Sequence, residues 1–186
     1  GLIIGALSST GTALAFSREL VVLVKGDLAL LLFTGALTSF ILGMGMTVTA
    51  CYIFLAIVLV PALISVGVPA MAAHFYVLYW GIVSAITPPV ALAAFVAAKI
   101  ANADSMKTGF RAMQIGIVTY FVPVLFVYDP RLLAIGSWSE IAYSFFRTAL
   151  AVVLIAGALE GYLIWLEVKL NKMLRIILVL AALMSA

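Results

Sequence analysis

Two groups of small and hydroxyl-bearing residues interrupt otherwise apolar stretches of the chain. The first group is Gly43, Gly45, Thr47 and Thr49, in the segment GMGMTVT. Na⁺ is a hard cation that prefers oxygen ligands. Threonine hydroxyls supply such oxygens, and so do the carbonyls that a helix leaves unpaired where it ends. The first group could therefore bind Na⁺ without a charged side chain.

The second group is Ser84, Ala85, Thr87, Pro88 and Pro89, in the segment SAITPP. Ser84 and Thr87 are three residues apart, which places both hydroxyls on one face of a helix. The two prolines end that helix. A helix that resumes at about Pro89, with Thr87 as its cap, would point its positive end toward an anionic group. One site could thus hold a cation and a carboxylate.

Each group also has a simpler interpretation. Serine and threonine in transmembrane helices commonly bond back to their own helix, and a Thr-Pro-Pro sequence commonly produces only a kink. The two groups together, separated by short apolar helices, favour a binding site more than either does alone. Neither group contains Asp or Glu, which favours Na⁺ over a proton relay through carboxylates.

The remaining reactive side chains form no catalytic or metal-binding pattern. The chain has one Cys and one His, too few for the usual zinc ligand sets. His74 is expected to be a packed or interfacial residue, and Met44 and Met46 are expected to pack against neighbours. Ser, His and acidic residues form no nucleophile motif. The sequence therefore predicts neither an enzyme nor an organic cofactor.

The composition indicates a protein surrounded by a lipid bilayer. Of the 186 residues, 67% are hydrophobic and 9% are charged, whereas soluble domains are about half apolar and a quarter charged. Apolar runs of helical length recur along the chain, which predicts an all-α polytopic membrane protein. No basic patch with interleaved aromatic residues is present, so a nucleic acid partner is not expected.

The first group lies at the tip of a predicted re-entrant hairpin over residues 28–66. An apolar helix over residues 28–42 would reach about 22 Å, short of the roughly 30 Å of a bilayer core. Gly43 and Gly45 would end this helix, and a second helix over residues 48–66 would bend at Pro61. Backbone exposed at that depth is tolerated only against protein or water. Two ordinary spans joined by a tight turn are the alternative.

The other segments are predicted from the same apolar pattern. Residues 1–27 would be the end of a preceding transmembrane helix and a polar loop containing Arg18 and Glu19. Residues 67–111 would be a helix over 70–86 that breaks before an alanine-rich half, followed by a polar loop over 99–111. Residues 112–186 would be C-terminal transmembrane helices. Within them we expect spans at about 112–128 and 142–166, a turn at 129–131, a charged loop at 167–175, a last helix from 176, and interface anchors at Trp138, Tyr143, Tyr162 and Trp165.

The distribution of cations predicts the orientation. Loops 99–111 and 167–175 would share one side and contain six cations, which are Lys99, Lys107, Arg111, Lys169, Lys172 and Arg175. The loops of the other side contain Arg18, Lys25 and Arg131. The positive-inside rule places the side with six cations in the cytoplasm, so the hairpin would enter the membrane from outside.

Several segments together resemble a known family. They are residues 43–46 (GMGM), 50–53 (ACYI), 67–74 (GVPAMAAH), 84–94 (SAITPPVALAA), 104–110 (DSMKTGF) and 126–130 (FVYDP). In this combination the chain resembles the large permease subunit of tripartite ATP-independent periplasmic (TRAP) transporters, over about residues 1–135. It is most similar to the fused permease that works with a TAXI-type binding protein.

The resemblance implies Na⁺-coupled import of an organic acid that a periplasmic TAXI-type solute-binding protein delivers. It implies an elevator-type transporter in the inner membrane, with this chain as the second inverted repeat and residues 28–66 as its re-entrant hairpin. The implied roles are that Gly43, Gly45 and Thr47 shape the tip and offer carbonyls, that Ser84 and Thr87 bind Na⁺ with neighbouring carbonyls such as that of Ala85, and that Pro88 and Pro89 fix the break.

Two residues depart from the pattern of that family. Thr47 stands where fused members usually have proline, which leaves the geometry of the tip open. Asp129 stands where asparagine is common, and this change is expected to concern only a surface turn.

Both ends of the sequence lie in apolar segments, as expected for a piece of a longer permease. The N-terminal half, with the first hairpin and the first Na⁺ site, would precede Gly1, and the chain would not transport by itself. Two other functions are a non-transporting membrane scaffold subunit and a fragment of a membrane enzyme. An enzyme would need His, Asp or Glu clustered at membrane depth.

Overall fold

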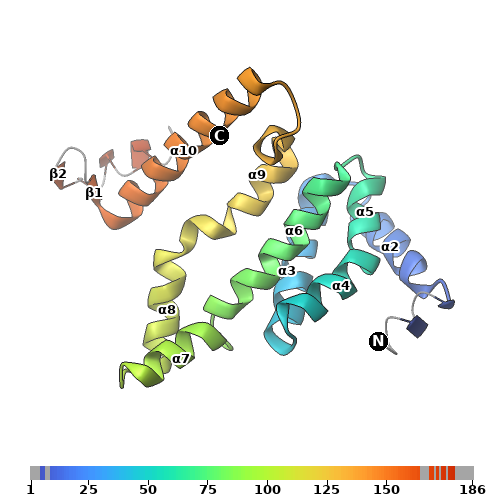
Figure 1. The fold of residues 1–186 in the computed structure, drawn as a ribbon, viewed down its shortest axis with the longest axis horizontal. Coiled ribbons are helices and arrows are strands. Elements are labelled where there is room, and N and C mark those ends of the chain that lie inside the picture. Colours follow the sequence, from blue (N-terminus) through green and yellow to red (C-terminus); the bar gives the residue numbers. More distant parts are fainter. Residues whose placement is uncertain are drawn as a thin grey trace. The chain divides into compact units, whose positions relative to one another are not determined.

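The computed structural model describes residues 5–6, 9–163, 168–169, 171, 173–174 and 176–178. Within these residues the chain is almost entirely helical, as the composition predicts. The exception is a two-residue antiparallel pairing of β1 (Tyr162–Leu163) with β2 (Val168–Lys169). The chain divides into two compact units, residues 1–127 and 128–186. Figure 1 colours the first unit from blue to yellow and the second from orange to red.

The first long helix, α2 (Thr12–Leu23), includes residues that the sequence assigned to a polar loop. That prediction was wrong for Arg18 and Glu19, which lie within the helix with their side chains exposed. The neighbouring Ser17 is buried, and its hydroxyl donates to the Val58 carbonyl. Charged residues are compatible with this helix because they occupy its exposed face while Ser17 faces the protein.

The predicted hairpin consists of α3 (Leu28–Gly45), α4 (Val48–Val58) and α5 (Val60–Ser65). Contrary to expectation, Gly43 and Gly45 lie inside α3, which has 18 residues. The chain leaves the helix at Met46, which is extended, and Thr47 then caps α4 by accepting from the Ala50 amide at 3.3 Å. Glycine costs a helix only about 1 kcal/mol per residue, which packing of the last turn offsets. The helix expected over residues 48–66 is interrupted at Leu59, two residues before Pro61.

Helix α6 (Ala70–Val83) continues into the 3-10 turn η1 (Ser84–Ile86), which confirms the helix predicted over residues 70–86. α6 packs against α3, α4 and α5 and forms the centre of the first unit (Figure 1). Its buried face includes Ala72, Ala73 and Tyr76, and the Tyr76 hydroxyl donates to the Leu32 carbonyl of α3.

The next helix, α7 (Leu92–Ile100), begins later than the sequence suggested. Residues 87–91 form a turn that contains a cis Pro88-Pro89 bond and ends at Ala91 with φ 35°. The expected restart at Pro89, with Thr87 as its cap, was therefore wrong. The Ala91 amide bonds to the Thr87 carbonyl at 3.1 Å, which closes this turn before helical geometry resumes.

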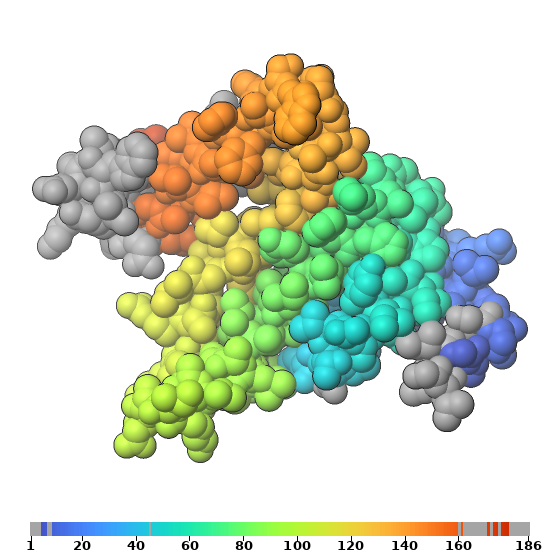
Figure 2. All heavy atoms as spheres, viewed as in Figure 1, coloured from blue at the N-terminus to red at the C-terminus, as the bar shows by residue number. Residues whose placement is uncertain are grey.

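The expected polar loop over residues 99–111 is mostly helical. Only residues 101–104 separate α7 from α8 (Ser105–Ile115), and the Asp104 carboxylate caps α8 by accepting from the Lys107 amide at 2.8 Å. α7 and α8 pack closely side by side, in light green to yellow at one end of the first unit (Figures 1 and 2). The span expected at 112–128 is not one continuous helix. The chain bends by 70° between α8 and the pair η2 (Ile117–Tyr120) and α9 (Val122–Tyr128).

The second unit contains η3 (Pro130–Leu133) and α10 (Trp138–Glu160). The predicted turn at residues 129–131 is confirmed. α10 begins earlier than the expected span, because Ser137 and Glu140 form a capping box, and it ends at Gly161, whose φ is 74°. Trp138 and Tyr143 are exposed on α10. The side chains of Tyr162 and Trp165, most of the loop at 167–175 and most of the last helix lie outside the described residues.

Two helical stretches among the described residues are long and apolar enough to cross a bilayer. They are Val48–Ser65 and Trp138–Leu159. The bent pair formed by α8 with η2 and α9 would be a third if it counts as one span, and Leu28–Met44 and Ala70–Ile86 are shorter apolar helices. These lengths and compositions agree with an integral membrane protein.

Candidate functional site

The last turn of α3 lies directly against the helix break that follows α6. A Cβ atom added at Gly43 would be 2.6 Å from Ser84 Oγ and 3.3 Å from the Gly81 carbonyl oxygen. Because a real Cβ does not approach an oxygen to 2.6 Å, this contact requires glycine. The structure thus brings together Gly43 from the first predicted group and Ser84 from the second.

The other members of the first group lie near this contact in sequence but have different surroundings. Gly45 ends α3. Thr47 and Thr49 are exposed at the start of α4, and the Thr47 hydroxyl caps that helix. Among the described residues, no hydrogen bond connects either threonine hydroxyl to the second group. Gly43 is therefore the member of the first group that the structure places against Ser84.

The two hydroxyl groups of the second group are both buried, with Ser84 2% and Thr87 6% exposed. Ser84 donates to the Gly81 carbonyl at 2.7 Å, and Thr87 donates to the Val83 carbonyl at 2.7 Å. These bonds are the back-bonding of the simpler interpretation. They use the one proton of each hydroxyl but leave its oxygen able to accept or to bind a cation.

The break also leaves backbone carbonyls without their helical donors. In a continuous helix the residues at 88 and 89 would donate to the carbonyls of Ser84 and Ala85, but proline has no amide proton. The Ser84 carbonyl accepts from the Thr87 amide at 3.3 Å instead. The Ala85 carbonyl cannot receive a bond from Pro89, and Ala85 is only half-buried. A hydroxyl oxygen and a carbonyl oxygen are thus available within two residues of each other.

Helix α8 and the turn η2 also contact the break. A Cβ at Gly109 would lie 3.0 Å from Pro88 Cγ, and a Cβ at Gly116 would lie 2.9 Å from Ile86 Cδ1. The Tyr120 hydroxyl makes a hydrogen bond with Thr87 Oγ1. Our sequence reasoning missed these contacts. The seven-residue spacing of Gly109 and Gly116 repeats one face of a helix after two turns, and this signal could have indicated the close packing.

In the described part of the chain, the hydrogen bonds at this break join hydroxyl groups and backbone groups and involve no charged side chain. Among the described residues, no group of three or more His, Cys, Asp or Glu side chains could hold a metal ion. The oxygen atoms present suit a monovalent hard cation better than a transition metal.

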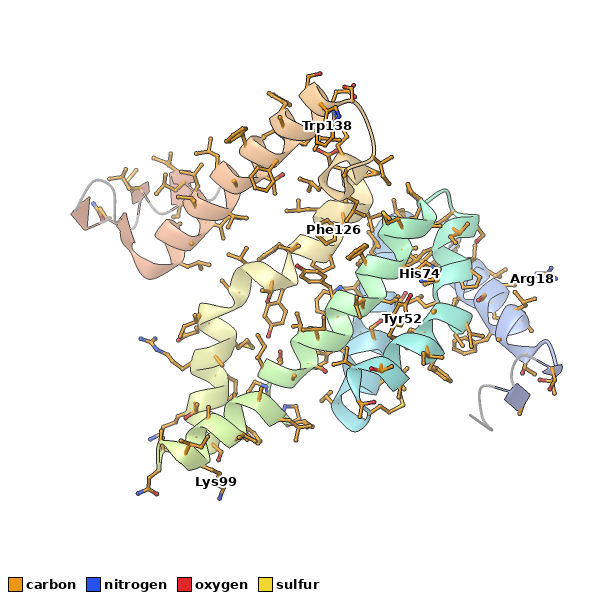
Figure 3. All side chains as sticks on the ribbon, viewed as in Figure 1. Arg18, Tyr52, His74, Lys99, Phe126 and Trp138 are labelled. Atoms are coloured by element: carbon orange, nitrogen blue, oxygen red, sulfur yellow. The ribbon has the colours of Figure 1, made fainter. Side chains whose placement is uncertain are left out.

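His74 is a packed residue, as expected. Its Nδ1 lies 3.0 Å from the Tyr52 hydroxyl, and the two ring centroids are 5.9 Å apart. Figure 3 shows the pair between α4 and α6, and both side chains are half-buried. The contact joins α4 to α6.

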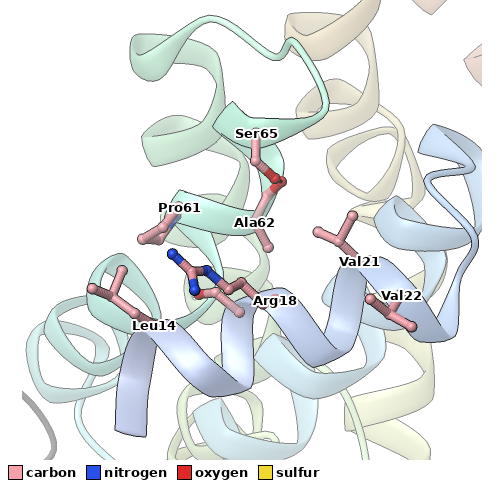
Figure 4. A pocket seen from close by; sticks show the side chains of 8 residues that line it. Leu14, Arg18, Val21, Val22, Pro61, Ala62 and Ser65 are labelled. Carbon is pink, nitrogen blue, oxygen red and sulfur yellow. Dashed lines mark hydrogen bonds between the residues drawn. The ribbon is translucent and has the colours of Figure 1, made fainter. Parts of the chain in front are cut away.

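A cavity of about 420 Å³ lies between α2 and α5 (Figure 4). Its lining is mostly apolar, and the Arg18 side chain extends across it toward Pro61 and Ala62. None of the residues that line it belongs to either predicted group, so this cavity is separate from the helix break.

Asp129 is buried in the second unit, which corrects the expectation of a simple surface turn. Its carboxylate accepts from Arg131 Nε at 2.6 Å and from Arg147 Nη2 at 3.1 Å, and only 6% of the residue is exposed. Burial by itself would raise the pKa of Asp129, but the hydrogen bond and positive charge of Arg131 outweigh burial and lower that pKa below its ordinary range. The carboxylate is therefore ionised and doubly paired at neutral pH.

The apolar helices among the described residues indicate a helical integral membrane protein. The family comparison gives a more specific assignment. The family model of the tripartite ATP-independent periplasmic transporter DctM component matches residues 1–141, and the chain belongs to this family. It is a component of a transporter and not an enzyme, and the family works with a periplasmic binding protein and a small subunit. No curated protein and no solved structure matched the chain.

Proposed function

We propose that the chain is part of the permease of a Na⁺-coupled importer of organic acids, and that Na⁺ binds where α3 meets the break after α6. The contact of Gly43 with Ser84 is the observation that carries this proposal. It joins both predicted groups in one place that offers hydroxyl and carbonyl oxygens. A cation can bind such oxygens reversibly because none of them carries a charge of its own.

Each residue of the site has a proposed role. Ser84 Oγ, Thr87 Oγ1 and the Ala85 carbonyl bind Na⁺. Pro88 and Pro89 withhold the amide donors of a continuous helix, and Pro89 thereby leaves the Ala85 carbonyl without its helical partner. In the first group, Gly43 permits the close approach of α3, while Gly45, Thr47 and Thr49 shape the junction where α3 ends and α4 begins. The carboxylate of the substrate would face the first turn of α7, whose free amides favour an anion.

The wider assembly follows from the family and from the resemblance to TAXI-associated permeases. A periplasmic TAXI-type protein would deliver the organic acid. Residues 28–66 would form the re-entrant hairpin of the second inverted repeat, which an elevator motion carries across the inner membrane. The N-terminal half of the permease would supply the first hairpin and the first Na⁺ site.

The test is Na⁺-driven uptake by the complete transporter in proteoliposomes, with its binding protein and a panel of labelled small carboxylates. We expect Thr87→Val to raise the Na⁺ concentration for half-maximal uptake. The loss in Na⁺ binding free energy should be roughly 1–3 kcal/mol, the contribution of one oxygen contact to a charged group. Thr87→Ser keeps the oxygen and should change that concentration much less. Thr34→Val is the matched control, because Thr34 back-bonds to the Leu30 carbonyl within α3. Uptake that does not respond to a Na⁺ gradient would contradict the proposal, as would a normal Na⁺ response in Thr87→Val.

A scaffold subunit without transport activity is the alternative, and a simpler measurement separates it. Na⁺ that binds only the folded state raises the melting temperature, and the stabilisation grows with the logarithm of the Na⁺ concentration above the dissociation constant. We expect NaCl, compared with KCl at equal ionic strength, to stabilise the purified permease. A scaffold would be equally stable in both salts.

A further inference from the structure

We propose that Tyr120 is a positioning residue for this Na⁺ site, because its hydroxyl donates a hydrogen bond to Thr87 and fixes the direction of the oxygen lone pair that remains. The proposal rests on the proposed function, since it concerns the ligand role of Thr87. It adds a residue from η2, which neither predicted group includes.

The direction of this hydrogen bond follows from counting protons. Thr87 has one hydroxyl proton, and it is donated to the Val83 carbonyl at 2.7 Å. The Thr87 oxygen must therefore be the acceptor in its contact with Tyr120, and the tyrosine hydroxyl must be the donor. A hydroxyl oxygen has two lone pairs, so Tyr120 occupies one and the other stays available. With its proton and one lone pair both held, the threonine oxygen can present the second lone pair in only one direction.

Packing holds Tyr120 in the position that this role requires. Tyr120 ends η2, directly after the 70° bend that follows α8. Its ring is half-buried and meets the Trp80 ring of α6 edge to face, at 6.0 Å between centroids. On the same side, Gly109 allows α8 to approach Pro88, and Gly116 allows the bend to approach Ile86. The three consecutive residues Ile86, Thr87 and Pro88 thus each face α8, η2 or the residue between them.

This arrangement connects the bend to the ion site. If the bend moved away from the break, the Thr87 oxygen would lose its second anchor and its orientation. By thermodynamic reciprocity, Na⁺ bound to an oriented Thr87 would stabilise the contact between η2 and the break. Tyr120 therefore affects Na⁺ only through Thr87.

The experiment measures binding of ²²Na⁺ to the purified complete permease, with choline replacing unlabelled Na⁺, so that no substrate is needed. We expect Tyr120→Phe to raise the half-saturating Na⁺ concentration roughly two- to tenfold, the range for one neutral hydrogen bond. In a Thr87→Val background the same change should have no further effect, whereas in a Thr87→Ser background it should. Tyr128→Phe is the matched control, since Tyr128 is an exposed tyrosine eight residues along the chain.

The outcomes distinguish this proposal from the proposed function. Wild-type permease that binds no ²²Na⁺, or Thr87→Val that binds it normally, would overturn the Na⁺ site and the role of Tyr120 together. If Thr87→Val weakens binding but Tyr120→Phe does not, only the role of Tyr120 is overturned. Effects of the two substitutions that multiply in the double variant would also overturn it, because a merely structural tyrosine acts independently of the threonine hydroxyl.

A second variant decides the question if Tyr120→Phe does not fold. Gly109→Ala keeps every hydroxyl but places a methyl group 3.0 Å from the rigid Pro88 ring and 3.3 Å from the Phe95 ring. It should push α8 away from the break and raise the half-saturating Na⁺ concentration in the same direction. Folded Gly109→Ala permease with wild-type Na⁺ binding would contradict the proposal.

Discussion

The helix break after α6 and the turn at Asp129 both bury polar groups beside proline, but they satisfy these groups by different means. At the break, hydroxyls donate to backbone carbonyls, and no charged side chain of the described residues takes part in these hydrogen bonds. At the turn, one buried carboxylate is paired with two guanidinium groups. The break keeps neutral oxygens with spare lone pairs, while at the turn the negative charge of the carboxylate is paired with two positive charges.

This difference distinguishes a site that can bind an ion from a turn that stabilises the fold. A cation that enters the break meets oxygens that accept few hydrogen bonds and belong to no ion pair. The cation can therefore bind without breaking an ion pair. Removing a partner from the turn would leave a charge in a region of low dielectric constant, which costs several kcal/mol. We therefore expect substitutions at the turn to change stability and substitutions at the break to change Na⁺ binding.

The largest effect should come from Asp129→Ala. The change leaves Arg131 and Arg147 without their shared carboxylate, and we expect it to lower the free energy of unfolding by about 2–3 kcal/mol. This is below the full cost of breaking a buried pair, because both arginine side chains are partly exposed. Thermal unfolding of the complete permease measures the loss, and Na⁺ binding should be unchanged in the folded fraction.

Asp104→Ala is a suitable control for that prediction. Asp104 is exposed and caps α8 through one hydrogen bond, so its removal should cost only about 1 kcal/mol. If both variants lose the same free energy of unfolding, the buried ion pairs at the turn stabilise the protein no more than an exposed helix cap does.

A substitution at the break should have a smaller effect on stability but a direct effect on the ion. In Gly43→Ala the new methyl group would collide with Ser84, and overpacking of this kind costs about 1–3 kcal/mol. We expect weaker Na⁺ binding as well, because α3 must withdraw from the break. Gly81→Ala is the matched control, since its nearest contact would be an ordinary 3.7 Å to Cys51 Sγ.

The double variant Gly43→Ala with Ser84→Gly separates packing from ion binding. It restores the space and should recover most of the lost stability, but it lacks the Ser84 hydroxyl and should still bind Na⁺ weakly. Full recovery of Na⁺ binding in this variant would exclude Ser84 as a ligand.

The sequence predicted the helix break after α6 better than the ion pairs at the Asp129 turn, for a physical reason. Proline pairs and glycines act locally, so residues 84–89 and the tip near Gly43 could be recognised without knowing their neighbours. Partners distant along the chain could not be recognised in that way. Arg147 lies 18 residues from Asp129 and Tyr120 lies 33 residues from Thr87, and no local pattern connects either pair.

Some helix boundaries were predicted wrongly for a related reason. The polar composition of residues 99–111 suggested a loop, yet α8 forms there because Asp104 caps it and its charged residues occupy an exposed face. Similarly, Gly43 and Gly45 suggested an early end to α3. Packing against Ser84 keeps the helix intact, and tertiary contacts of this kind override local propensity.

The pH dependence of stability should also distinguish the two regions. The folded state lowers the pKa of Asp129, so the stabilisation by this carboxylate is complete above its unfolded pKa of about 4 and is lost as the pH falls through the lower folded value. In that acid window, wild-type permease should lose at most about 1.4 kcal/mol per pH unit more than Asp129→Ala. Unfolding midpoints of both proteins, measured from about pH 3 to about pH 7 in steps of about one pH unit, determine this difference. Parallel curves for the two proteins would mean that the folded state does not hold Asp129 ionised.

The smallest effect concerns Ser39, which lies one helical turn before Gly43 on α3. The residue is fully buried, and its hydroxyl has no hydrogen-bond partner among the described residues, although its carbonyl accepts from the Cys51 thiol at 3.7 Å. An unpaired buried hydroxyl is unfavourable, so Ser39→Ala should raise the free energy of unfolding by about 1 kcal/mol. Ser65→Ala, at an exposed hydroxyl that bonds to the Ala62 carbonyl, should change it by less than about 0.5 kcal/mol.

Measuring ²²Na⁺ binding in Ser39→Ala then tests how far the ion site extends from the break along α3. If the ion site is confined to the break, Na⁺ affinity stays at the wild-type value while stability rises, because the lost hydroxyl had only a desolvation cost. Weaker Na⁺ binding would mean that the Ser39 oxygen also serves the ion. In that case the site extends a full turn along α3, and a buried hydroxyl without a protein partner is a ligand position rather than a packing defect.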